Sequence, residues 1–287
     1  MKKPIPRGFI AFIAFTIALT SGLSSVPALL AQAPAAKGAA TGPAPKSKAE
    51  LEALQTMFGA KDPDTRIAQA QNVLTKFADS DFKPIALFFI AASYEQKNDF
   101  PNMVVYAERT IEADPKNYGA MLMLARGIAS KTRENDLDKE EKLTRAEKYA
   151  NGALDALKDA PKPQPQMPDD QWNAAKKDYI AQAHEALGIS AMVRKKYDVA
   201  AKEFQTSVDT STAPDPATMV RLAAADNQLG KYDEAIAVLD KVMAAPDAQP
   251  AVKQFAQAEK VRAKQGKDKG AKPADTKAAP PQVEIKP

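Results

Sequence analysis

Three stretches of the chain repeat one spacing of small, aromatic and apolar residues, and this repetition limits the fold more than any other feature. In each, a Leu or Ile is followed at once by Gly or Ala, and Tyr or Phe comes ten residues after that Leu or Ile. A Met or Ala lies three residues beyond the aromatic, and an Ala, Phe or Leu follows four residues later. The stretches read IAASYEQKNDFPNMVVYA at 90–107, LGISAMVRKKYDVAAKEF at 187–204 and LAAADNQLGKYDEAIAVL at 222–239.

This spacing suits two helices packed closely as a hairpin. The small residue after Leu or Ile lets the second helix approach the first, and Ala200 and Ala235 do the same from the facing helix. Aromatic residues fill the space at the turn, and Pro closes each stretch after the second helix. Aromatics are only 7% of the chain, which disfavours a β-sandwich. The sequence therefore predicts an all-α fold of helical hairpins.

These hairpins resemble the tetratricopeptide repeat (TPR), a helix–turn–helix unit of about 34 residues. Placing the first small residue at the eighth position of each unit gives starts at Pro84, Tyr118, Ala181 and Pro216. The resemblance covers roughly residues 49–264 and implies a right-handed solenoid. Its units lie near 84–117, 118–158, 181–214 and 216–249, with a degenerate unit at 49–83 and a capping helix at 250–264.

Two regions depart from the repeat. Nine extra residues separate the two helices of the unit at 118–158, and their charged sequence, KTRENDLDKEEK, predicts a hairpin lengthened into solvent. A Pro-rich loop at 160–168 comes before a long helix, expected from about Trp172 to Val193.

The N-terminus has the layout of an export signal. Lys2, Lys3 and Arg7 precede an apolar run at 9–19, and small residues follow. We expect residues 1–28 to be a signal peptide cleaved after Ala28, which places the protein in the periplasm or outside the cell. Cleavage after Ala33 would put Pro34 beside the broken bond. The alternative is an uncleaved membrane anchor formed by residues 8–30.

Both ends of the chain have the composition of flexible tethers. Residues 29–48 are rich in Ala and Pro, residues 265–287 are rich in Lys, Pro and Ala, and we expect both segments to be disordered. The two ends together carry more positive charge than the net +4 of the whole chain, so the repeats between them are net acidic. No basic stripe with interleaved aromatics occurs there, which argues against binding of nucleic acid.

Composition excludes most enzymatic and metal chemistry. The chain has no Cys and one His, so thiolate sites, disulfides and two-histidine metal motifs are impossible. We expect His184 to be a packed structural residue and Trp172 a packing residue at a helix start. The acidic segment 134–141 is expected to be a solvated face, because an EF-hand loop counted from Asp136 has Glu141 where Gly is needed. The sequence therefore predicts no enzyme, no cofactor and no metal.

The resemblance implies a protein or peptide partner bound in a concave groove, which the first helix of each repeat lines at positions 2, 5, 9 and 12. The residues at these positions that we expect to contact the partner are Phe88, Ala92, Glu95, Leu122, Arg126, Glu185, Ile189 and Met192. The Lys/Asn/Arg clamp with which some members of the family hold a C-terminal carboxylate is absent, because Phe88, Ala92 and Met123 occupy its first positions.

Two functions remain open. The favoured one is a scaffold or adaptor of the bacterial cell envelope that binds a peptide or helix in the groove. The alternative is an accessory subunit of an envelope complex that is held through its tails and has no specific groove ligand.

Overall fold

The computed structural model describes residues 43–164 and 166–270, which hold eleven α-helices and divide into two compact units between residues 106 and 107. The predicted signal peptide, the alternative anchor at 8–30 and most of both predicted tethers lie outside the described residues. Among the described helices, none is long and apolar enough to cross a membrane.

The N-terminal unit, residues 43–106, contains α1 (Lys48–Gly59), α2 (Pro63–Lys76), α3 (Lys83–Gln96) and the start of α4 (Phe100–Ala113). The C-terminal unit, residues 107–270, contains the rest of α4, α5 (Tyr118–Lys131), α6 (Lys139–Lys158), α7 (Asp169–Val193), α8 (Tyr197–Thr210), α9 (Pro216–Gln228), α10 (Tyr232–Ala244) and α11 (Pro250–Asp268).

In the N-terminal unit, α1 and α2 occupy the stretch that fits the repeat least well. The Ser47 hydroxyl accepts a hydrogen bond from Glu50 N at 3.1 Å and caps α1. Glu50 is buried, and its carboxylate accepts hydrogen bonds from Lys46 N at 2.6 Å and from Ser80 Oγ at 2.5 Å. The apolar core of this unit joins α1, α2 and α3, with Leu54, Met57, Ile67, Ala70, Val73, Ala86 and Ile90 buried together.

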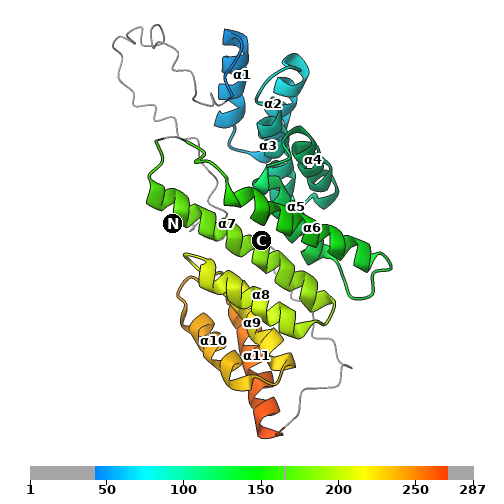
Figure 1. Cartoon of the computed structure of the whole chain (residues 1–287), viewed down its shortest axis with the longest axis vertical. Helices are drawn as coiled ribbons and strands as arrows, with labels where there is room; N and C mark the ends of the chain where they lie inside the picture. Colours follow the sequence, from blue (N-terminus) through cyan, green and yellow to red (C-terminus); the bar gives the residue numbers. More distant parts are fainter. Residues whose placement is uncertain (1–42, 165, 271–287) are drawn as a thin grey trace. The chain divides into compact units, whose positions relative to one another are not determined.

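The C-terminal unit is a series of helical hairpins, each packed on the next (Figure 1). The pairs α5–α6, α7–α8 and α9–α10 follow one another, and α11 packs on α9 and α10. Each buried apolar cluster spans a hairpin and its neighbour, which is how stacked repeats bury a continuous core. The predicted all-α fold of helical hairpins is thus confirmed.

Close helix approach occurs where the repeat spacing predicts it. A Cβ built on Gly188 of α7 would lie 2.6 Å from the Phe204 ring of α8, so only glycine fits this crossing. Ala200 and Ala235, at the facing position of their hairpins, are fully buried.

The turns of three hairpins share a backbone feature that the sequence comparison did not reveal. Asn98, Lys195 and Gly230 each precede the aromatic residue of their hairpin by two positions, and their φ angles are 56°, 60° and 74°. These values lie in the left-handed region, which Gly and Asn adopt easily and Lys does not. The same turn therefore recurs with different degrees of backbone strain.

The charged insertion between α5 and α6 is held in place rather than simply projecting into solvent. Arg194, at the end of α7, donates to Glu140 at 2.7 Å and to Thr144 at 3.3 Å, and it also pairs with Glu147. Lys195 pairs with Glu134 at 2.5 Å. Leu137, at the tip of the loop, is fully exposed.

The last helix is longer than the predicted capping helix. α11 continues from Lys264 to Asp268, so the first residues of the predicted disordered tail are helical. The physical reason is packing: Gly266 lies against the Tyr232 ring, where a Cβ would come within 2.5 Å of the ring carbons. The helix therefore covers the end of the α9–α10 hairpin along most of its length.

Candidate functional site

The first helices of three successive hairpins in the C-terminal unit are joined by a row of polar side chains. Arg221 Nη1 on α9 donates to Glu185 Oε1 on α7 at 2.8 Å. On the other side of α7, Arg126 Nε of α5 lies 3.8 Å from Glu185 Oε2, and Arg126 Nη1 donates to Gln182 Oε1 at 3.2 Å. We call Arg126, Gln182, Glu185 and Arg221 the first-helix strip.

The first-helix strip is partly exposed and carries unequal charge. The side chains of Arg126, Arg221 and Glu185 are 33%, 22% and 14% exposed. Two guanidinium groups thus share one carboxylate, which leaves one positive charge in excess. Because these side chains are half-buried, solvent screens the excess charge less than it would screen a fully exposed charge.

Two of the predicted groove residues, Arg126 and Glu185, lie in the strip. Leu122 is buried in the cluster formed by α5, α6 and α7, because α6 and α7 both pack on that face of α5. Ile189 and Met192 are half-buried and pack on the buried cluster formed by α7, α8 and α9. The structure therefore brings two predicted residues together as a polar contact, buries Leu122, and leaves Ile189 and Met192 partly exposed. The role of these residues in binding a partner stays a prediction.

The other three predicted groove residues belong to α3 in the N-terminal unit. Phe88 and Glu95 are half-buried there, and Ala92 is buried. They are described within that unit alone, and their role in binding a partner stays a prediction.

The pattern of positions missed Arg221. It follows Val220, the position expected to face the groove, yet Val220 is buried in the core of α9, α10 and α11. The aliphatic part of an arginine side chain is long. The guanidinium of Arg221 can therefore contact Glu185 even though residue 221 is one position beyond the expected one. An available signal was Glu185, an acidic residue of α7, which lies in sequence between two first helices that each carry an arginine.

His184 and Trp172, predicted from the sequence to be packing residues, contact neighbouring side chains. His184 Nδ1 lies 2.7 Å from Glu203 Oε2, which links α7 to α8. Trp172 is buried and packs near Tyr118, whose ring also lies 5.1 Å from that of Tyr179. Burial raises the pKa of Tyr118 to about 12, so this phenol stays protonated at neutral pH.

The acidic insertion is paired with basic side chains. Asp136 and Asp138 both contact Lys142, at 3.2 and 2.8 Å. In the part of the chain that the structure describes, no group of three or more His, Cys, Asp or Glu side chains is arranged to hold a metal ion.

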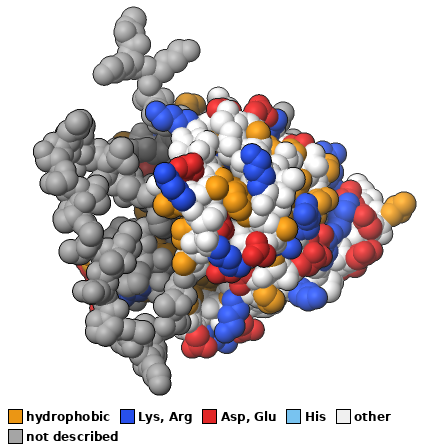
Figure 2. Space-filling model, turned by 90° about the horizontal axis from the view of Figure 1, so that it is seen from above, with side chains coloured by type: hydrophobic (Ala, Val, Ile, Leu, Met, Phe, Trp, Pro, Cys, Tyr) orange, Lys and Arg blue, Asp and Glu red, His pale blue; other side chains and the backbone are white. Residues whose placement is uncertain are grey.

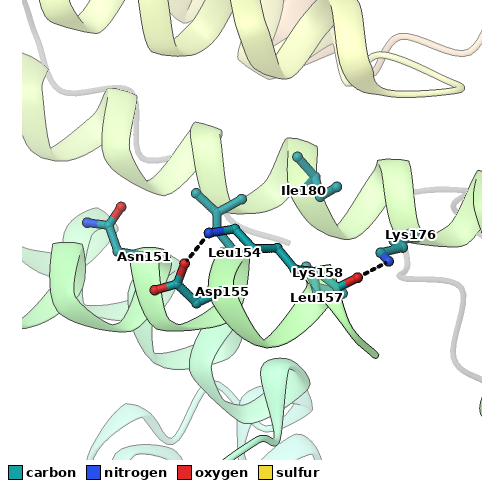
Figure 3. A pocket seen from close by; sticks show the side chains of 7 residues that line it. All are labelled: Asn151, Leu154, Asp155, Leu157, Lys158, Lys176 and Ile180. Atoms are coloured by element: carbon teal, nitrogen blue, oxygen red, sulfur yellow. Dashed lines mark hydrogen bonds and ion pairs between the residues drawn. The ribbon is translucent and has the colours of Figure 1, made fainter. Parts of the chain in front are cut away.

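A shallow hollow of about 430 Å³ lies between the C-terminal half of α6 and the start of α7. Leu154, Leu157 and Ile180 line it, as Figure 3 shows. At its rim Lys158 pairs with Asp155 at 2.7 Å, and Lys176 Nζ donates to the Lys158 carbonyl at 3.0 Å. Lys158 and Asp155 pair with each other and Lys176 binds a backbone carbonyl, so the hollow offers mainly apolar contact. On the face drawn in Figure 2, basic and acidic side chains are mixed rather than gathered by sign.

Comparisons with known proteins found similarity among solved structures. No protein-family model and no curated protein matches the sequence. A solved structure of a thermophilic TPR protein from Thermus thermophilus is similar, with 14% identity and a TM-score of 0.48. The similarity covers 74% of this chain and 95% of that one. At this identity it is a likeness of helical fold alone.

Proposed function

We propose that this protein is a non-enzymatic scaffold of the bacterial cell envelope, and that it binds a peptide or helix across the first helices of its C-terminal unit. Stacked helical hairpins present equivalent positions of successive first helices side by side, which makes a continuous surface suited to an extended partner. The observation that carries the proposal is the first-helix strip, in which Glu185 links α7 to both α5 and α9 while the side chains remain partly exposed.

Export is part of the proposal and is supported by the sequence of residues 1–28. Intact-mass measurement of the native protein tests it: loss of these residues is expected. Recovery of the full-length chain in the membrane fraction alone would instead identify the segment as an anchor.

Site-specific photo-crosslinking in the native cells tests the binding surface. We expect a photoreactive residue at Gln182 to form an adduct with a partner protein. The matched control is Lys202, an exposed residue of the second helix α8, which should form no such adduct. Adducts of equal yield at both positions would contradict binding at the first helices.

The alternative, an accessory subunit held through its tails, predicts the opposite pattern. Truncation after Gly270 leaves α11 and its packing intact and removes the C-terminal tail. If the truncated chain loses its partner and the Gln182 adduct never forms, the tails carry the association. We favour the first-helix surface because its contacts join three hairpins.

A further inference from the structure

The two arginines of the first-helix strip have unused hydrogen-bonding capacity. A guanidinium carries five N–H donors. Arg221 directs one hydrogen bond to Glu185 at 2.8 Å, and Arg126 directs one to the neutral amide of Gln182 at 3.2 Å. The 3.8 Å between Arg126 Nε and Glu185 is too long for a hydrogen bond. Within the described residues, most of these donors therefore remain free for a further acceptor.

The net positive charge of the strip favours a negatively charged acceptor. Glu185 lies between the two arginines and neutralises only one of them. A second carboxylate placed beside Arg126 would complete a one-to-one pairing and could accept two parallel hydrogen bonds from its planar donor fork. A carboxylate is also the group that peptides supply most readily, from Asp, Glu or the chain end.

The surroundings of the strip favour a peptide over a small anion. Ile189 and Met192 follow Glu185 by four and seven residues along α7, so they lie on the same face of that helix. Both are half-buried, and each keeps some apolar surface exposed beside the charged group. A peptide with an acidic residue and a neighbouring apolar side chain matches this arrangement.

We infer that Arg126 and Arg221 bind a carboxylate of the partner peptide, and that Glu185 is the chain's own competitor for these two arginines. The inference rests on the proposed function and names the chemistry of the partner. It has an unusual consequence, because removing the acidic residue of the site should strengthen binding. Removing the arginines should weaken it.

The first experiment identifies the chemistry of the bound peptide. Two random 12-residue peptide display libraries, one with a free C-terminus and one with a blocked C-terminus, are selected against the full chain without residues 1–28. We expect Asp or Glu to be enriched at one position in the blocked library. Enrichment in the free library alone would identify the chain end as the source of the carboxylate, which also supports the site.

The second experiment uses fluorescence anisotropy with one selected acidic peptide and its Glu→Gln or Asp→Asn twin. Arg126→Gln with Arg221→Gln should weaken binding of the acidic peptide roughly ten- to a hundredfold and abolish its advantage over the twin. Glu185→Gln should strengthen binding of the acidic peptide about three- to tenfold. Arg133→Gln, which removes an exposed arginine from the α5–α6 loop, is the matched control and should change neither.

The double arginine variant leaves Glu185 unpaired, so its folding needs a separate control. The triple variant Arg126→Gln, Glu185→Gln, Arg221→Gln has no unpaired charge and should keep the circular dichroism spectrum while lacking the acidic preference. Peptides selected without acidic enrichment, or an acidic preference kept by the triple variant, would overturn the inference and leave the scaffold proposal standing. Failure of both libraries to yield any binder would count against the proposed function as well.

Discussion

Gly188 of α7 and Phe204 of α8 are in contact so close that a single added methyl group has no room. A Cβ at Gly188 would lie 2.6 Å from two carbons of the ring, and the ring itself is fully buried. Because the buried ring has no free space to move into, Gly188 fixes how closely α7 and α8 approach.

Gly188→Ala should therefore lower the free energy of unfolding. Overpacking a core costs about 1–3 kcal/mol, and the better helix propensity of Ala returns roughly 1 kcal/mol, so we expect a net loss of up to about 2 kcal/mol. Urea unfolding followed by circular dichroism measures it. Gly152→Ala is the matched control, since its nearest neighbour is the flexible end of Met121, and it should be close to neutral.

The left-handed backbone of the turns predicts that substitutions at Gly230 and Lys195 affect stability differently. Gly230 has φ of 74°, so Gly230→Ala should cost about 1–2 kcal/mol of backbone strain. Lys195 has φ of 60°, so Lys195→Gly relieves backbone strain. This gain offsets the loss of the half-exposed ion pair between Lys195 and Glu134, so the variant should be no less stable than the wild type. Thermal unfolding of both variants checks this. A lower melting temperature for Lys195→Gly than for Gly230→Ala would show that the ion pair matters more than the turn.

The sequence predicted what depends on residues close together in the chain. The recurrence of small residues and aromatics at fixed offsets identified the hairpins and the tight crossing at Gly188, because each hairpin is built from about 34 consecutive residues. It did not predict that Arg221 would meet Glu185, which is 36 residues away. That contact depends on how one hairpin lies on the next, and the charged ends of long side chains do not follow a fixed position in the repeat.

One buried amide adds a polar contact to the apolar packing of α11 on α9. Asn227 Nδ2 donates to the Glu259 carbonyl at 3.1 Å and to Glu259 Oε2 at 2.9 Å, and both residues are buried. Asn227→Ala would leave the buried Glu259 carboxylate with only Arg262, at 2.7 Å. We expect a loss of about 1–3 kcal/mol and faster amide hydrogen exchange confined to α11 and the end of α9. Uniformly faster exchange over the whole C-terminal unit would contradict a local role.

Asp226, next to Asn227, makes stability depend on pH. It is buried, and desolvation raises its pKa from 3.8 to about 6, with Lys231 lowering and Glu234 raising the pKa in addition. Between these two values the folded chain holds a proton that the unfolded chain has lost, so this group's contribution to stability falls as pH rises from about 4 to 6. Above that range the burial penalty is complete, at most about 3 kcal/mol.

Asp226→Asn removes this penalty, so the variant should be more stable than the wild type by about 1–3 kcal/mol at pH 7.5, with a much smaller difference near pH 4. Urea unfolding of both proteins at the two pH values measures this difference. Asp247→Asn, at an exposed acid between α10 and α11, controls for the change in net charge. An Asp226→Asn chain less stable than the wild type at pH 7.5 would mean that the ionised carboxylate is paired in the fold.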